Sequence, residues 1–202
     1  MGSFIFCTFS WGFLQVIPRS ELLGGFLFCA VPLIAVLYYL RWDIKAIIRK
    51  PKAKEVGLAV LLFVCYIIYT MGTEPILSIL GLVETPPVDS NTITIFSFIP
   101  LIFIVMGEEI LKFIPFIFVM RLAYKFSDNR KLSIILAMLT IMVFFGLIHA
   151  MDVKSIIPAI IVQGFGSIFE LYGYIKTKNI LIPYITLLCT DVFLYAIVLS
   201  GL

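Results

Sequence analysis

Histidine is almost missing from this chain, and charged residues are scarce. The 202 residues include a single histidine, His149, and only 13% are charged. One histidine cannot build a histidine-rich zinc site, and the sequence holds no HExxH motif. The four cysteines are spaced neither as a disulfide framework nor as a zinc ligand set, and all lie inside apolar runs: Cys7, Cys29, Cys65 and Cys189. We therefore expect no metal and no cofactor.

Internal repeats and low-complexity segments are also missing. Many secondary transporters are built from structural repeats that leave a weak symmetry in the sequence, and this chain shows none. Its net charge is only +3, and most basic residues sit in short loops between apolar runs. That distribution fits membrane topology and anionic headgroups. We see no basis for nucleic-acid binding.

Long apolar runs are what the chain has in abundance. Hydrophobic residues make up 62% of it, and the mean hydropathy is +1.14. A membrane span needs about 20 apolar residues. Seven runs qualify as candidate spans: 4–17, 22–40, 56–72, 94–124, 132–151, 156–175 and 180–202. We therefore expect an all-α, polytopic transmembrane helix bundle that forms one domain over residues 1–202.

Two segments of that bundle are irregular. The run 4–17 is short and ends at Pro18. It lacks the basic residues that precede the apolar region of a signal peptide, so we expect a short or tilted helix. Residues 76–83 form a possible eighth apolar piece after the break predicted at 72–75. They are too few to cross a bilayer, so we expect them at the interface or in a re-entrant segment.

Basic residues predict the orientation of the bundle. Twelve of the fifteen lysines and arginines lie in the stretches 41–54, 121–131 and 176–178, which the expected spans put on one face. The opposite loops are mainly acidic. The positive-inside rule makes the basic face cytoplasmic, with the N-terminus inside. We expect an integral protein of a bacterial or archaeal cell membrane.

Six ionisable residues remain inside the expected spans, and they are the candidates for function. A charge at the centre of a bilayer costs roughly 2.5 kcal/mol or more on insertion scales, so such residues normally face the bundle interior. The six are Glu108, Glu109, Lys112, His149, Glu170 and Asp191.

The glutamate pair lies in an unusually long run. A continuous helix over 94–124 would measure about 45 Å, more than the hydrocarbon core, so it has to tilt, project or bend. Pro115 predicts a bend beside the glutamates. Glu108 and Lys112 have the i,i+4 spacing of an ion pair, which leaves Glu109 free to face a cavity. The alternative is a structural ion pair with a spare protonated glutamate.

The remaining three residues are ambiguous from sequence alone. A lone helical histidine such as His149 is more often structural than catalytic, whereas Asp191, in the middle of a span, has no inexpensive structural explanation. Glu170 is near the expected cytoplasmic face and is a candidate partner of Arg121 or Lys176.

In order and spacing, these residues resemble the CAAX protease and bacteriocin-processing family of intramembrane proteases, also called the Abi family. That family carries EExxxR, FxxxH and HxxxN on successive membrane helices. Here Glu108 and Glu109 match the first motif, and Phe145 and His149 match the second. The stretch 173–183 is similar to the turn before the last motif, and the resemblance covers about residues 95–195.

The chain departs from the family pattern at three positions. Phe113 occupies the arginine position, with Lys112 one place earlier, as in the EExxK of PrsW-type proteases. Leu187 stands where the last histidine is expected, and Asp191 replaces the asparagine. In the family, glutamates and histidines activate water and an amide stabilises the oxyanion. Asp191 could donate that hydrogen bond only when protonated.

The resemblance implies an intramembrane endopeptidase that uses glutamate-activated water on peptides or membrane-protein termini. Its catalytic residues would be Glu108, Glu109, His149 and Asp191. Structural or secondary roles would fall to Lys112, Phe145 and Glu170. The chief alternative is a catalytically degenerate scaffold or immunity protein that binds a membrane-protein partner. A proton-coupled transporter is a third class.

Overall fold

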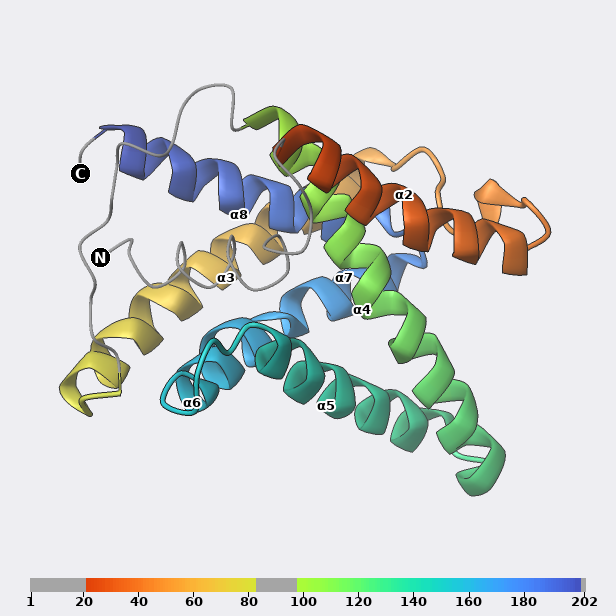
Figure 1. Ribbon diagram of the computed structural model, residues 1–202. Helices are drawn as coiled ribbons and strands as arrows, with labels where there is room; N and C mark the ends of the chain where they lie inside the picture. The colour runs from red at the N-terminus through yellow and green to blue at the C-terminus, as the bar shows by residue number, and fades with distance from the viewer. Residues whose placement is uncertain (1–20, 83–97, 201–202) are drawn as a thin grey trace.

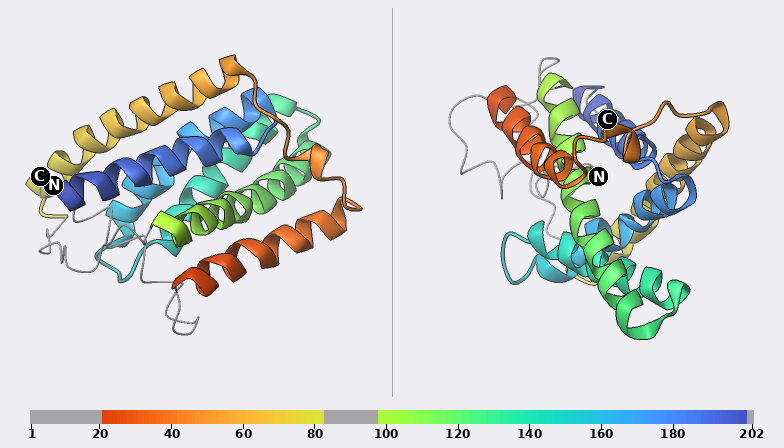
Figure 2. Two further views of the ribbon diagram at one scale, coloured as in Figure 1. Left: turned by 90° about the horizontal axis from the view of Figure 1, so that it is seen from above. Right: turned by 90° about the vertical axis from the view of Figure 1, so that its right-hand side faces the viewer.

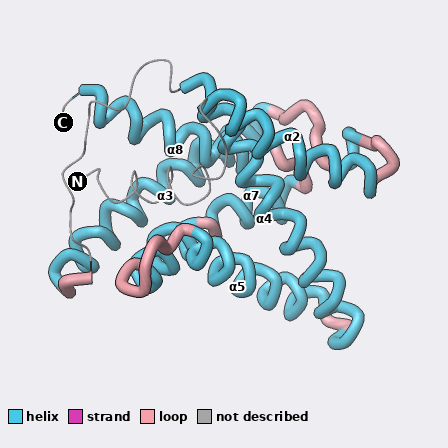
Figure 3. Tube along the Cα trace, in the orientation of Figure 1, coloured by secondary structure: helices cyan, strands magenta, loops and turns pink. Residues whose placement is uncertain are grey.

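The computed structural model describes residues 21–82 and 98–200, and this part of the chain is all-helical, without a strand (Figure 3). The helices are α2 (Glu21–Tyr39), α3 (Ala53–Ile79), α4 (Phe98–Ser127), α5 (Arg130–Ile148), α6 (Ile156–Ala159), α7 (Ile168–Thr177) and α8 (Leu181–Ser200). A short 3₁₀ turn, η2 (Ile44–Ala46), follows α2, and a π-helix, η5 (Ile160–Phe165), connects α6 to α7.

Helix α4 runs through the middle of the bundle, between α2 and α5 (Figure 1). Helices α3 and α8 lie side by side, and α7 packs against both of them (Figure 2). The main core joins α4, α5 and α7, where apolar side chains such as Phe116, Ile141 and Leu171 are almost completely buried. This arrangement brings the middle of α4 against α5, α7 and α8.

Within the described residues, four helices are long and apolar enough to cross a membrane, covering 22–39, 53–79, 130–148 and 156–177. Their outer faces carry large exposed hydrophobic side chains, such as Ile68 on α3 and Ile135 on α5. Lipid contact accounts for such surfaces, which water would penalise. Membrane association is thus supported, whereas the full count of seven spans is not. The run 4–17 lies outside the described residues. Helix α4 is not among the four because Glu108, Glu109 and Lys112 interrupt its apolar sequence.

The predicted break in the third span is wrong. Helix α3 continues through residues 72–75 and ends only at Ile79, so residues 76–79 belong to it and not to a separate piece. Pro75 cannot donate a hydrogen bond to the carbonyl of Met71, but this removes one bond close to the end of a 27-residue helix. Helices inside membranes tolerate such a proline because neighbouring groups compensate for the freed backbone carbonyl.

The basic stretches gather at one end of the bundle, as the charge pattern predicted. The α2–α3 connection, the α4–α5 turn and the α7–α8 turn all lie at that end (Figure 2). Asn179 in the α7–α8 turn donates to the backbone carbonyl of Arg49, and the Arg49 guanidinium donates to the carbonyl of Thr177. These bonds tie two of the basic stretches together.

The opposite end contains the turn between α5 and α6. Its backbone is held by reciprocal hydrogen bonds in which the Ser155 amide donates to the Asp152 carboxylate, and the Asp152 amide donates to the Ser155 hydroxyl. The Ser155 backbone N–H is the main reason that the pKa of Asp152 lies below its usual range. This exposed turn follows directly after His149.

Candidate functional site

The ionisable residues expected inside the spans meet in the centre of the bundle. Lys112 is fully buried and forms ion pairs with Glu109, three residues earlier on α4, and with Glu170 on α7. Glu109 is also fully buried, and Glu170 is only 3% exposed. Two helices therefore meet at one buried cation between two carboxylates, here called the Lys112 ion centre.

Two sequence predictions about these ion pairs are wrong. The expected i,i+4 partner of Lys112 was Glu108, but Lys112 turns toward α7 and uses the i,i+3 partner Glu109. Glu170 was expected to pair with Arg121 or Lys176, but α7 is oriented so that Glu170 faces α4 and binds Lys112. The reason is burial: a glutamate facing the interior needs a cation there, whereas Lys176 and Arg121 lie toward the water-exposed end.

Glu108 on α4 and Asp191 on α8 are two further carboxyl groups near the Lys112 ion centre. Both are buried, at 6% and 5% exposure, and they are close enough to influence each other electrostatically, as well as Glu170 and Lys112. One carboxyl oxygen of each, Glu108 Oε2 and Asp191 Oδ2, has no hydrogen-bond partner within the described ranges 21–82 and 98–200. An unpaired buried carboxylate is expensive, so a proton or a bound water has to satisfy these oxygens.

Phe145 and His149 connect α5 to the ion centre. Lys112 Nζ is 4.6 Å from the centroid of the Phe145 ring, a cation–π contact, and the Phe145 and His149 rings are 4.3 Å apart. His149 caps the C-terminus of α5, where its Nδ1 lies 2.7 Å from the Phe145 carbonyl oxygen. A carbonyl only accepts, so Nδ1 carries the hydrogen, and Nε2 is the acceptor in the neutral ring.

This geometry gives a physical meaning to the FxxxH spacing. Residues four apart lie on one helix face, so the Phe145 carbonyl can orient the His149 ring while the Phe145 ring contacts Lys112. His149 itself is 8% exposed. The structure thus places all seven site residues expected from sequence in one region, contributed by α4, α5, α7 and α8.

Close packing of α5 against η5 holds the end of α5 in place. A Cβ atom on Gly146 would lie 2.5 Å from the Cα of Ile160, and one on Gly164 would collide with the backbone carbonyl of Met142. Only glycine allows the two backbones to approach this closely. The π-helical turn lies directly beside this contact, and such turns occur frequently at functional sites.

Sequence reasoning missed Tyr66 on α3. Its side chain is buried and lies close enough to Glu170, Asp191 and Glu108 to interact with their charges. Its ring packs against Gly166, leaving no room for a Cβ atom there. A phenol inside an apolar run is a weak signal, because tyrosines are common in membrane helices, so only the packing of α3 against α7 identifies it.

Metal ligation finds no support in this geometry. Across residues 21–82 and 98–200, no three histidine, cysteine or acidic side chains are arranged to hold a metal ion. Cys29, Cys65 and Cys189 are free thiols, and Cys7 lies outside the described residues. The one cation that the carboxylates surround is the ammonium group of Lys112.

Comparison of the chain with protein-family models, curated proteins and solved structures returns no match in any of the three.

Proposed function

We propose that this protein is an intramembrane endopeptidase that uses glutamate-activated water, with Glu108 as the general base. The observation behind this proposal is the division of labour among the buried carboxylates. Glu109 and Glu170 form ion pairs with Lys112, whereas Glu108 and Asp191 form no ion pair within residues 21–82 and 98–200, and each keeps a buried oxygen without a hydrogen-bond partner. The oxygens of Glu109 also lack a hydrogen-bond partner, but one of them contacts the Lys112 ammonium group. A carboxylate that is close to a cation but not bound to it can accept a proton during a reaction.

The reaction assigns one role to each group. Glu108 takes a proton from water as the water oxygen attacks the carbonyl carbon of the scissile amide, and the carbonyl electron pair moves onto oxygen. Protonated Asp191 donates a hydrogen bond to that oxyanion, and the positive charge of Lys112 stabilises it further. When the tetrahedral intermediate collapses, the C–N bond breaks and Glu108 returns the proton to the leaving amine. His149 Nε2, the acceptor in the neutral ring, accepts a hydrogen bond from the attacking water and so orients it toward the carbonyl.

Lys112 takes the place of the arginine in the family that the sequence resembles. The substrates are peptides or termini of membrane proteins, and the protein resides in a bacterial or archaeal cell membrane with its basic end in the cytoplasm. The N-terminus is also on that side, following the positive-inside rule. Catalysis needs no metal or cofactor.

A catalytically inactive scaffold is the second candidate, and a specific observation favours it. Lys112 and Glu109 are completely buried. A buried ion network of this kind can have a purely structural role, in which it fixes how α4 packs against α7. Leu187 and Asp191 also replace two polar residues of the family motif. A scaffold with this fold would bind a membrane-protein partner and need no base.

Glutamine substitutions separate these two candidates. Glu108→Gln keeps the size and hydrogen-bonding capacity of the side chain but removes its basicity. We expect it to reduce cleavage of peptides in a detergent-based library assay by about 10²–10⁴-fold without loss of folding, and His149→Ala to weaken cleavage strongly. Lys131→Gln, which removes an exposed charge on the neighbouring helix α5, is the matched control.

The scaffold candidate makes the opposite forecast. In that case Glu108→Gln, Glu109→Gln and His149→Ala would all retain the cellular phenotype in a complementation test, provided that each variant folds. Full complementation by all three would refute the protease proposal.

For the protease, metal chelators added to the cleavage assay are expected to leave the cleavage rate unchanged.

A further inference from the structure

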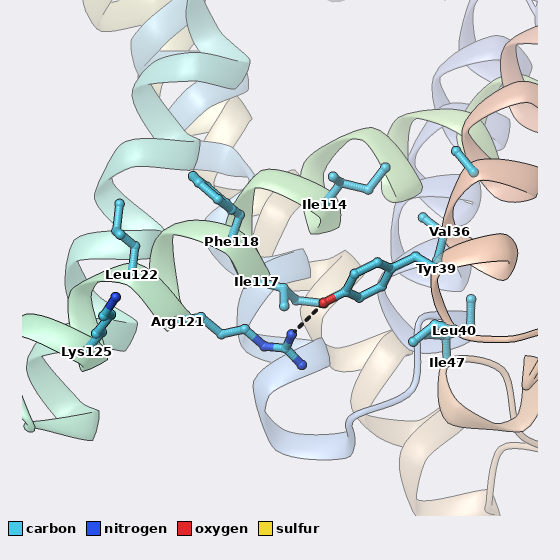
Figure 4. Close-up of a pocket in the computed structure, with 11 residues that line it drawn as sticks. Val36, Tyr39, Leu40, Ile47, Ile114, Ile117, Phe118, Arg121, Leu122 and Lys125 are labelled. Atoms are coloured by element: carbon cyan, nitrogen blue, oxygen red, sulfur yellow. Dashed lines mark hydrogen bonds between the residues drawn. The ribbon is translucent and has the colours of Figure 1, made fainter.

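A separate pocket lies between α2 and α4 at the basic end of the bundle, away from the ion centre. It has a volume of about 740 Å³, which falls within the range of pockets that hold small molecules. Its walls are apolar side chains from the last turns of α2, from Ile47 and from one face of α4 (Figure 4). We call it the α2–α4 groove.

Two basic side chains mark the outer end of the α2–α4 groove. Arg121 and Lys125 line it, and no acidic residue does so among the described lining residues. Arg121 donates a hydrogen bond to the Tyr39 hydroxyl at 3.1 Å, as the dashed line in Figure 4 shows, and it has no carboxylate partner in the part of the chain that the structure describes. Lys125 is exposed and likewise has no ion-pair partner within residues 21–82 and 98–200.

The inner end of the groove is entirely apolar. A narrow extension of about 40 Å³ continues from it and shares four lining residues, including Ile114 and Ile117. The extension ends at Ile110, Phe113 and Tyr174. The groove is therefore amphipathic along its length, with a cationic mouth at the basic end and an apolar interior.

From these features we infer that the α2–α4 groove binds an anionic phospholipid, with its phosphate at Arg121 and Lys125 and an acyl chain along α4. The charge complementarity is direct, because a guanidinium binds phosphate oxygens in a two-pronged geometry and Lys125 adds a second positive charge. Basic pockets between membrane helices on the cytoplasmic side are suited to anionic headgroups. Tyr39 is placed as tyrosines at membrane interfaces commonly are, with its ring against apolar surface and its hydroxyl toward the polar region.

Lipid titration of the purified full-length chain in detergent tests this inference. The two probes are phosphatidylglycerol and phosphatidylcholine with identical acyl chains, and retention is measured by native mass spectrometry together with the shift in melting temperature. We expect tighter binding of phosphatidylglycerol. Arg121→Gln should weaken it about fivefold, and the double change Arg121→Gln with Lys125→Gln about twenty-five-fold, since each basic residue near the headgroup contributes a similar increment.

Two matched controls keep the test specific. Lys131→Gln removes an exposed charge at the same basic end but outside the groove, and should leave the affinity unchanged. Ile114→Trp fills the groove and should reduce phosphatidylglycerol binding, whereas Ile135→Trp, on the exposed face of α5, should not. A circular-dichroism spectrum and a melting temperature for each variant confirm that it folds.

Three results would overturn the inference. They are equal affinity for the two lipids, unchanged affinity in the double glutamine variant, and a thermal shift by glycerol phosphate equal to that by the whole lipid. The last outcome would assign the site to a free phosphate group and leave the apolar interior without a role.

Discussion

At the scale of single residues, Lys112 holds the buried charges together. Among residues 21–82 and 98–200 it is the only cation placed among the four buried carboxyl groups, and it contacts two of them directly. Removing one member of a buried ion pair leaves the other without compensation, which costs far more than the net stability of the pair. Lys112 is therefore expected to be the most sensitive position in the bundle.

The corresponding prediction is that Lys112→Met lowers the free energy of unfolding by roughly 3–5 kcal/mol, because Glu109 and Glu170 remain buried without a cation. Unfolding in detergent micelles, followed by circular dichroism, measures the change. Lys131→Met is the control, and the loss of its exposed side chain should have almost no effect. Adding Glu109→Gln and Glu170→Gln to Lys112→Met should restore part of the lost stability. Equal stability of Lys112→Met and the wild type would show that the lysine reaches water.

Phe145 offers a second residue-level prediction. Phe145→Leu keeps the carbonyl that orients His149 but removes the ring that contacts Lys112. A desolvated cation–π contact contributes about 0.5–2 kcal/mol. The free energy of unfolding should therefore fall by about this much more in Phe145→Leu than in Phe144→Leu. Phe144 is the adjacent residue and 37% exposed, so it is a close control. Equal melting temperatures of the two variants would contradict the contact.

At the scale of helices, the approach of α5 to η5 decides where His149 lies. Two glycines permit that approach, Gly146 on α5 and Gly164 on η5. Other glycines of the chain are not in close contact with a neighbouring helix, since a Cβ atom on Gly57 or Gly72 of α3 would meet nothing within 4 Å. These four positions therefore form a matched set.

We predict that Gly146→Ala and Gly164→Ala destabilise the protein, because the added methyl group meets backbone atoms that cannot move aside. Overpacking of this kind typically costs about 1–3 kcal/mol. Gly57→Ala and Gly72→Ala should instead stabilise α3 by roughly 0.5–1 kcal/mol, as alanine favours the helix. Thermal unfolding of the four single variants gives the comparison. Loss of stability in all four, or in none, would argue against the close contact.

At the scale of the whole molecule, the basic end and the turn containing Asp152 lie at opposite ends of the bundle. The α5 helix connects the two, with Arg130 at one end and the α5–α6 turn at the other. The positive-inside rule assigns the basic end to the cytoplasm. In this proposed orientation, the mouth of the α2–α4 groove would face the leaflet that is rich in anionic lipid.

Cysteine labelling tests that orientation. With the native cysteines replaced, a membrane-impermeant maleimide added to intact cells should label Val153→Cys, whose side chain is 83% exposed, and should not label Lys50→Cys or Lys178→Cys. All three should react after the membrane is permeabilised, which controls for accessibility. Labelling of the two lysine positions in intact cells would reverse the assigned topology.

The amino-acid sequence by itself determined the class of protein and the membership of the buried polar set. Apolar runs, basic turns and isolated charges are properties of short segments, so they can be recognised without knowing how the segments pack. The helical bundle, the gathering of basic turns at one end and the charged residues at its centre were predictable on this basis, whereas Tyr66 was not. Pro75 misled the prediction because helix breaking depends on how the freed carbonyl is compensated, which is not a local property.

Only the tertiary structure decided which of these groups contact one another. Both Glu108 and Glu109 are within reach of Lys112 along α4, and the rotation of α4 against α7 selects Glu109. Glu170 lies 58 residues from Lys112, so no local pattern links them. Tyr66 and the α2–α4 groove likewise arise where helices from the first half of the chain pack against the second. Helix rotation and spacing result from the fit of many side chains at once, and that fit exists only in the folded bundle.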